Sequence, residues 1–333
     1  MSRPELDVLG IGNAIVDVLS HTEDNFLVKH DLVKGAMTLI DAATADRLYE
    51  AMGAGIECSG GSAANTIAGV ASLGGAGGYI GKVKQDQLGR IFAHDIRALG
   101  VEFITPATPD GAPTARCLIF VTPDAQRTMQ TYLGACVELG PEDIDPGQVA
   151  APKIVYLEGY LWDPPGAKQA FRKAMQVAHE NNRLVSLSLS DAFCVERYRD
   201  EFRQLVENEI DILFANEAEI MSLARASSFD EALQYARGLP GIVALTRSAK
   251  GSVIVSGEEI HIVDAAPLTQ LVDTTGAGDL YAAGFLYGIC NGASLPAAAR
   301  IGGICAAEVI SHVGARPQVP LHQLVAAQVK IRA

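Results

Sequence analysis

Apolar runs of strand length alternate with longer amphipathic stretches along most of the chain. Pairs of this kind occur at 76–83 and 87–99, at 153–162 and 164–182, and at 184–190 and 195–207. Short apolar runs between turn residues predict buried strands, and apolar residues at every third or fourth position predict helices. Repeated strand–helix units predict an α/β fold, with a mostly parallel sheet covered by helices on both faces.

Two segments interrupt this alternation, residues 18–45 and 104–134, where polar and apolar positions alternate instead. Within the second segment, 116–122 and 127–133 flank the turn sequence Pro-Asp-Ala-Gln, which indicates a hairpin. We predict that both segments are insertions that form a small β-sheet lid, so that residues 1–333 make one domain. Closure of such a lid would exclude water from a site beneath it.

The sequence DTTGAGD at 273–279 joins a glycine turn to a carboxylate. A short apolar run ends just before it at Leu271 and Val272, and an apolar stretch follows at 280–289. We therefore predict a strand, a glycine turn and a helix. Glycines lack a Cβ atom and can aim successive N–H groups at one point, where the helix dipole adds positive charge.

This turn suits phosphoryl transfer. Three oxygens of a γ-phosphate would fit against the N–H groups of Gly276, Ala277 and Gly278. Asp279 lies beside that point, where an ionised carboxylate can accept the proton of an attacking alcohol. The alternative is that Asp279 only stabilises the start of the helix, as acidic residues in a first turn do.

A second glycine cluster, SGGSAAN at 59–65, precedes an alanine-rich helical pattern. The paired glycines Gly60 and Gly61 allow a ligand to approach the backbone closely. Ser62 and Asn65 supply hydrogen-bonding groups suited to a polyol. The alternative is a serine-rich helix cap with glycines that only make a tight turn.

The first predicted strand covers residues 7–14, and Asp17 follows it. A carboxylate at the end of a first strand is well placed to accept hydrogen bonds from two vicinal hydroxyls. Gly10 and Gly12 suggest a dinucleotide-binding fingerprint, but Ile15 stands where the third glycine of GxGxxG is required. The sequence therefore argues against a dehydrogenase.

The sequence NEAE at 216–219 follows a strand pattern at 211–214. Taken with their order and separation, NEAE, DTTGAGD and GGSAAN resemble the motifs of the ribokinase (PfkB) family of carbohydrate kinases, over essentially the whole chain. The resemblance implies a ribokinase-like fold, ATP as the donor, and magnesium held largely through water, with Asn216 and Glu219 at the nucleotide and Glu219 near the metal. The alternative for this segment is an ordinary helix start with acidic residues in its first turn.

Within the family, the closer similarity is to adenosine kinases, in the stretches 12–17, 181–193 and 206–219. It implies phosphorylation of the 5′-hydroxyl of a nucleoside, most directly adenosine to AMP in purine salvage, with Asp279 as general base. It places the ribose hydroxyls on Asp17, Gly61, Ser62 and Asn65, beside Gly60. Arg127, on a predicted lid strand, would neutralise phosphate charge.

The same similarity places apolar side chains around the base, at Met37, Leu39, Met129 and Leu161. An aromatic residue is common at the last of these positions, whereas here the aromatic residues are its neighbours, Tyr160 and Trp162. A flat base can still be gripped between apolar surfaces and a nearby ring. The alternative for Met37 and Met129 is packing within the lid sheet.

The predicted nucleotide loop, TRSAKG at 246–251, keeps Thr246 and Gly251 but carries Ser248 where the family usually has glycine. A serine can be accommodated there if its φ is negative, so we expect ATP binding to persist with a somewhat altered loop geometry. The alternative is a plain β-turn between two strands. A monovalent cation beside the anion-binding turn is common in the family; Asp273 and Thr275 are its candidate ligands, and potassium is the candidate ion.

Composition agrees with a cytoplasmic metabolic enzyme. The 333 residues are 49% hydrophobic, enough for one large domain with a small appendage. A net charge of −13 argues against nucleic-acid binding, and neither a membrane span nor a signal peptide is predicted. The six cysteines lack metal-ligand spacing, which is typical of a reducing compartment. Relatives occur as monomers and homodimers, and both states stay open.

Two other functions stay open at this point. A kinase of a free sugar or sugar acid, such as ribose, fructose or 2-keto-3-deoxygluconate, would use the same base and phosphate groups with a different lid pocket. A non-catalytic nucleoside-binding protein would keep the fold and lose the chemistry, although the base, both turn glycines and the NxxE residues are all present.

Overall fold

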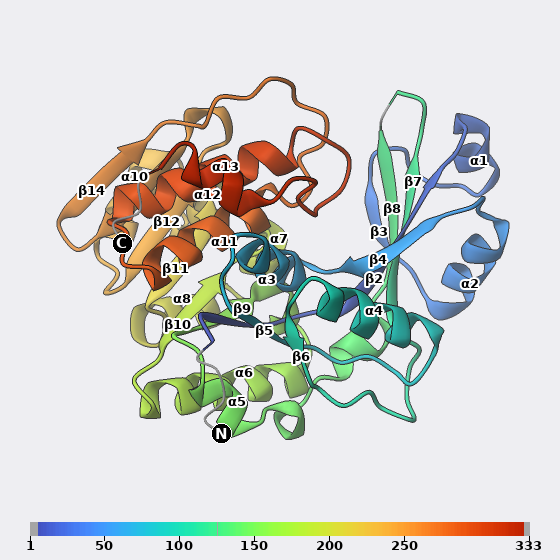
Figure 1. Ribbon diagram of the computed structural model, residues 1–333, viewed down its shortest axis with the longest axis horizontal. Helices are drawn as coiled ribbons and strands as arrows, with labels where there is room; N and C mark the ends of the chain where they lie inside the picture. The colour runs from blue at the N-terminus through green and yellow to red at the C-terminus, as the bar shows by residue number, and fades with distance from the viewer. Residues whose placement is uncertain (1–5, 125, 330–333) are drawn as a thin grey trace.

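The larger of two sheets forms the centre of the molecule (Figure 1). The computed structural model describes residues 6–124 and 126–329, and in these residues this sheet has nine strands in the order β14-β13-β12-β11-β10-β9-β1-β5-β6. The strands are β1 (Val8–Ile11), β5 (Gly77–Ile80), β6 (Glu102–Phe103), β9 (Ile154–Glu158), β10 (Leu184–Ser188), β11 (Ile212–Asn216), β12 (Ile242–Thr246), β13 (Ser252–Ser256) and β14 (Glu259–Val263). Only the pairs that involve β13 are antiparallel among these.

Both faces of the middle of this sheet are buried, which explains why strands such as β1 and β9 are almost continuously apolar, whereas the edge strand β14 is mostly exposed. Ile154 and Tyr156 of β9 point into one core, and Val155 and Leu157 point into the other. Helices α3 (Ser62–Ser72), α4 (Gln87–Ala98), α11 (Ala277–Cys290), α12 (Leu295–Val309) and α13 (Leu321–Ala326) cover the first face. The second is covered by α5 (Pro146–Ala150), α6 (Pro165–Glu180), α7 (Ala192–Arg197), α8 (Arg199–Asn208), α9 (Glu217–Ala224) and α10 (Phe229–Arg237). The predicted fold class is confirmed.

A smaller sheet stands to one side of the molecule, at the right of Figure 1. In the described residues its strand order is β3-β8-β7-β2-β4. The strands are β2 (Ile15–His21), β3 (Met37–Leu39), β4 (Ile56–Gly60), β7 (Ala115–Val121) and β8 (Arg127–Tyr132), accompanied by α1 (Asp24–Lys29) and α2 (Ala42–Ala51). The hairpin β7–β8 lies where the sequence predicts it, with Ala125 of its turn outside the described residues, whereas β4 lies beyond both predicted insertions.

The register of the small sheet sets which side chains share a face. Asp17 pairs with Cys58 on one side and with Cys117 on the other. Because paired residues point to the same face, and alternate residues along a strand do so too, Arg127 and Met129 lie on the face that carries Asp17. Met37 and Leu39 of β3 join this face, which we call the inner face of the lid.

Two predicted elements differ from the structure. The predicted strand before the glycine turn is wrong, because the described chain from 264 to 274 contains no strand. Leu271 is 63% exposed, and the main chain of Val272 is held by a hydrogen bond to Ile310 instead of a sheet. The predicted helix at 195–207 is two helices, α7 and α8, which meet at Tyr198.

Candidate functional site

Gly276 begins helix α11 in a left-handed conformation, with φ of 79°. Its Cα lies so close to Ala315 that a Cβ atom there would come within 2.9 Å. The N–H of Ala277 donates to the carbonyl of Thr274 at 3.2 Å, so that donor is used within the turn. The N–H groups of Gly276 and Gly278 donate to no atom of the described chain, and Gly278 borders open space. In the described residues these two amides are therefore free to donate to a ligand, whereas the amide of Ala277, which the sequence also predicts as a donor, is already used.

Asp279 joins the two glycine motifs. Its carboxylate accepts hydrogen bonds from Ser62 Oγ at 2.6 Å and from Asn65 Nδ2 at 2.9 Å. Both donors lie in the first turn of α3, which packs against α11. Burial raises the pKa of Asp279, while Ser62, Asn65 and the charge of Arg316 oppose that rise. The donors on α3 and the charge of Arg316 therefore favour the ionised form of this buried carboxylate.

Asp17 lies on the inner face of the lid, next to the second glycine cluster. A Cβ atom at Gly60 would collide with the Asp17 carboxylate, and one at Gly61, where φ is 97°, would collide with the carbonyl of Asn13. Burial raises the pKa of Asp17 to about 6, against the opposing charges of Arg316 and Arg127. The glycines thus leave room for a carboxylate that is close to changing its charge at neutral pH.

Arg127 reaches from the lid to the glycine turn. It forms an ion pair with Asp273 at 2.7 Å and donates to Thr275 Oγ1 at 3.1 Å. Asp273 also accepts hydrogen bonds from the main chain of Thr275 and Gly314, so the cation beside it in this structure is a guanidinium. Arg127 Nε and Nη2 are buried and have no hydrogen-bond partner among the described residues, which leaves two donors for an oxyanion.

Asn216 and Glu219 form a capping box at the start of α9. Both oxygens of Glu219 accept hydrogen bonds from Asn216, at 2.9 Å from its main chain and at 2.6 Å from its side chain. Burial raises the pKa of Glu219 to about 7. The geometry fits the helix-start interpretation, and the remaining lone pairs of Glu219 also fit a water of a hydrated metal ion.

The loop after β12 lies next to this capping box, since Thr246 pairs with Asn216 across neighbouring parallel strands. Gly251 has φ of 79° and packs on the main chain of Val263. Ser248 has φ of 52°, so the condition of a negative φ is not met. A serine here adopts the left-handed conformation that a glycine adopts at no steric cost.

The base-binding candidates divide between the lid and the main sheet. Met37 and Leu39 are 51% and 60% exposed on the edge strand of the lid, next to the partly buried Met129. Tyr160 is 40% exposed, whereas Leu161 is fully buried in the second core. Leu161 therefore packs inside the protein, and Tyr160 is the residue that faces out.

Tyr160 lies near several carboxylates. Burial raises its pKa, and the charges of Asp191, Glu158, Asp279 and Glu219 add to the rise. Its main-chain N–H donates to Ser190 Oγ.

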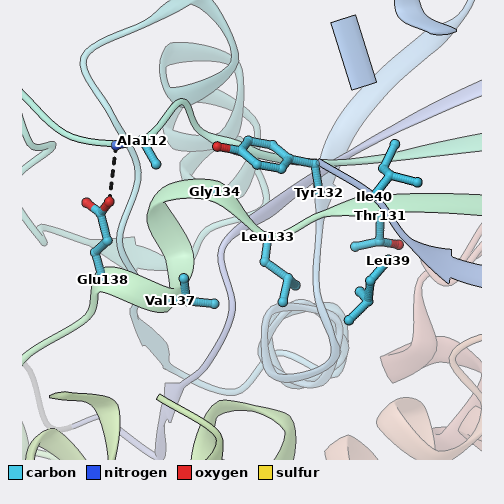
Figure 2. Close-up of a pocket in the computed structure, with 9 residues that line it drawn as sticks. All are labelled: Leu39, Ile40, Ala112, Thr131, Tyr132, Leu133, Gly134, Val137 and Glu138. Carbon is cyan, nitrogen blue, oxygen red and sulfur yellow. Dashed lines mark hydrogen bonds between the residues drawn. The ribbon is translucent and has the colours of Figure 1, made fainter. Parts of the chain in front are cut away.

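A cavity of about 320 Å³ opens where the lid meets the main domain. Figure 2 shows the side chains around it, with the carboxylate of Glu138 held by the N–H of Ala112. Its walls come from the ends of β3 and β8, from the segment after β8 and from the loop before β7: Leu39, Ile40, Ala112, Thr131, Tyr132, Leu133, Gly134, Val137 and Glu138. The cavity is mostly apolar and shares Leu39 with the inner face of the lid.

Two residues at the site are absent from the sequence-based set. Glu158, fully buried at the end of β9, accepts hydrogen bonds from Ala63 N at 2.8 Å and from Asn13 Nδ2 at 2.7 Å. An acidic residue inside an apolar strand pattern was the signal for it. Arg316 contacts the backbone on both sides of Ser62, and a single arginine in a loop gives no comparable signal.

The described residues contain neither a helix that could span a membrane nor a cluster of metal-binding side chains. None of their helices is both long and apolar enough to cross a membrane. They also contain no group of three or more histidine, cysteine, aspartate or glutamate residues arranged to hold a metal ion.

Family models, solved structures and curated sequences all include kinases that are similar to this chain. The family model for pfkB family carbohydrate kinases matches residues 49–321. The crystal structure of adenosine kinase from Sinorhizobium meliloti is 51% identical, with a TM-score of 0.90, and the match covers 98% of this chain and 100% of that one.

Curated relatives include both nucleoside and sugar-acid kinases. Adenosine kinase of Saccharomyces cerevisiae is 27% identical over 94% of this chain and 97% of its own length. A 5-dehydro-2-deoxygluconokinase of Bacillus subtilis is 26% identical over 81% of this chain and 87% of its own length.

Proposed function

Since the chain belongs to the pfkB family of carbohydrate kinases, we propose that it transfers the γ-phosphoryl group of ATP to the 5′-hydroxyl of a nucleoside, most directly adenosine. The observation that carries this proposal is the carboxylate of Asp279 at the start of α11, held by Ser62 and Asn65. The products would be the nucleoside monophosphate and ADP.

Catalysis rests on positioning and charge neutralisation. Asp279 accepts the proton of the 5′-hydroxyl as the new O–P bond forms, and the bond between the γ-phosphorus and the bridging oxygen of ADP breaks. The N–H groups of Gly276 and Gly278 and the free donors of Arg127 stabilise the oxygens of the transferred group. Since the loose transition state of phosphoryl transfer lets the proton leave late, a weak base is sufficient.

Magnesium fits the nucleotide side of this site. Glu219, next to Asn216, would hold the ion through water, and the ion would neutralise charge on the nucleotide phosphates. Thr246 and Gly251 would border the same nucleotide, because their loop follows the strand next to Asn216. Binding of a potassium ion at Asp273 would have to accommodate the guanidinium of Arg127 already there.

The acceptor is proposed to be a nucleoside because the site has a polar and an apolar half. Asp17, Ser62 and Asn65 supply the polar groups that two ribose hydroxyls need. The inner face of the lid supplies Met37, Leu39 and Met129, which suit a flat base, and a free sugar has no such apolar part. We place the enzyme in the cytoplasm, where the six free cysteines would stay reduced.

The second candidate is a kinase of a sugar acid. The resemblance to a 5-dehydro-2-deoxygluconokinase supports it, and the base, anion-binding turn and nucleotide residues would serve it equally well. The two candidates differ only in what fills the apolar half of the site.

An ADP-release assay with magnesium and ATP distinguishes them. The acceptors are adenosine, guanosine, inosine, cytidine, ribose, fructose, 2-keto-3-deoxygluconate and 5-dehydro-2-deoxygluconate. The proposal predicts turnover of adenosine well above that of the sugars and sugar acids. Turnover of a sugar acid with none of any nucleoside would overturn the nucleoside assignment and keep the chemistry.

A further inference from the structure

Arg316 holds the start of helix α3 from outside it. Its Nε and Nη2 donate to the carbonyl of Ser59 at 3.2 and 2.7 Å, and Nη2 also donates to Ser59 Oγ at 3.1 Å. Its Nη1 donates to the carbonyl of Ala64 at 2.9 Å. One guanidinium thus fixes the backbone on both sides of Ser62, within the segment that supplies both donors to Asp279.

Arg316 also belongs to the loop that supports the glycine turn. Two residues before it, Gly314 donates its N–H to Asp273 at 3.0 Å. One residue before it, Ala315 packs against Gly276 closely enough to leave no room for a Cβ atom there. The same short segment therefore touches the anion-binding turn through its backbone and the Ser62 segment through its side chain.

Arg316, in the C-terminal loop, places a positive charge near Asp17 and Asp279. The acidic groups that face it come from four elements: Asp17 on β2, Cys58 on β4, Asp95 on α4 and Asp279 on α11. Asp95 adds a second hold on the same segment, because it accepts hydrogen bonds from the N–H and Oγ of Ser59. The positive charge of Arg316 opposes the rise in pKa that burial imposes on Asp17 and Asp279.

We propose that Arg316 is a positioning residue for phosphoryl transfer, which fixes Ser62 and Asn65 against Asp279 and holds the anion-binding turn in register with them. It contacts none of the reacting atoms. This inference rests on the proposed function, because it assigns Arg316 to the base that the proposal names.

The test uses three variants of the full chain, Arg316→Met, Arg316→Lys and Arg97→Met, assayed on the acceptor that the unmodified enzyme phosphorylates. Arg97 is the matched control, because its guanidinium also makes two hydrogen bonds to one carbonyl, that of Phe103 on the far edge of the sheet. The readouts are kcat, KM, the pH profile of kcat/KM, and the unfolding temperature.

For Arg316→Met we expect kcat to fall by about 100-fold, because a misplaced base and turn cost that much. We also expect the acidic limb of the kcat/KM profile to move to higher pH, because loss of the cation raises the pKa of both Asp17 and Asp279 further. Arg316→Lys keeps the positive charge and loses the planar array of guanidinium N–H donors. The acidic limb of the kcat/KM profile should therefore stay in place while kcat falls by about tenfold. Arg97→Met should leave kcat and the profile unchanged.

Two results would overturn the inference. One is an Arg316→Met protein with kcat within about twofold of the Arg97→Met control. The other, decisive if the methionine variant does not fold, is an Arg316→Lys protein with unchanged kcat. Failure of the proposed function looks different, since the unmodified enzyme itself would then phosphorylate no nucleoside.

Discussion

At the scale of single residues, the site gathers carboxylates that burial drives toward their neutral forms. Asp17, Glu158 and Asp279 each have a raised pKa. Hydrogen-bond donors oppose the rise at Glu158 and Asp279, whereas at Asp17 the charges of Arg316 and Arg127 oppose it. The sequence predicts Asp17 and Asp279, because both follow recognisable motifs. It could not predict their pKa values, which depend on groups such as Arg316 that lie far away along the chain.

Asp17 should make substrate binding depend on pH. With a pKa of about 6, its carboxylate is ionised above pH 6 and becomes protonated below it, where it accepts fewer hydrogen bonds from a ribose. The KM for the acceptor should therefore rise by about tenfold per pH unit below 6. Steady-state assays from pH 5 to 8 measure this; Asp17→Asn should have a high KM without that rise, and parallel curves for the two proteins would contradict the assignment.

Glu158 should make stability depend on pH. Burial raises its pKa in the folded protein to about 7, above the ordinary value of 4.5, so the folded state binds an extra proton between these values. Its contribution to stability is therefore fully present below pH 4.5 and is lost as the pH rises to about 7.

Urea unfolding of the unmodified protein and Glu158→Gln checks this. The stability of the variant relative to the unmodified protein should rise by up to about 3 kcal/mol from pH 4.5 to pH 8. Glutamine stays neutral at every pH in this range. The buried Oδ1 of Asn13, which has no hydrogen-bond partner among the described residues, can accept the glutamine amide N–H if the side-chain amide of Asn13 flips. A constant difference across this range would show that Glu158 does not titrate as described.

At the scale of elements, hydrophobic periodicity located most of the main sheet and its helices. The strand 184–188 and the helix 165–180 lie within the segments predicted for them, 184–190 and 164–182, because both have regular apolar patterns. The strand predicted before the glycine turn is wrong because its apolar pattern is short and tertiary contacts decide the conformation there. Two apolar residues, Leu271 and Val272, resemble a strand end, but tertiary hydrogen bonds to Ile310 hold that segment as a loop.

Close packing of α11 on α12 should not tolerate a side chain at Gly284. A Cβ atom there would come within 2.8 Å of the backbone of Gly302, so Gly284→Ala should destabilise the protein by about 1–3 kcal/mol. Gly303→Ala on α12 is the control, since its Cβ would meet nothing closer than 3.8 Å and alanine favours a helix. Chemical denaturation compares the two; equal effects would contradict the packing argument.

The nucleotide loop should gain stability from a glycine. Ser248 has a left-handed conformation, with φ of 52°, which costs a side-chain-bearing residue about 1–2 kcal/mol. Ser248→Gly should therefore raise the free energy of unfolding by about 1 kcal/mol, after the greater freedom of glycine in the unfolded chain is counted. Ser248→Ala keeps the Cβ atom and serves as the control. A glycine variant less stable than the alanine variant would contradict this account.

At the scale of the whole molecule, the candidate site draws on both sheets. Asp17 and Arg127 come from the lid, Asp279 from a helix on the main sheet, and Asn216 from the end of β11 in that sheet. Sequence pattern predicted a parallel main sheet and a β lid. It could not predict strand order or the fifth lid strand, β4, because pairing between distant segments leaves no local pattern.

The most direct test of the central claim is phosphoryl transfer from ATP by Asp279→Asn, with Asp264→Asn, an exposed residue, as the control. Transfer is followed at saturating ATP and adenosine, and adenosine binding is followed by calorimetry. We predict a rate lower by about 10²–10⁴-fold, because a general base contributes that much, with adenosine affinity within a few-fold of the unmodified protein. An Asp279→Asn protein that transfers phosphate at the rate of the control would contradict Asp279 as the base.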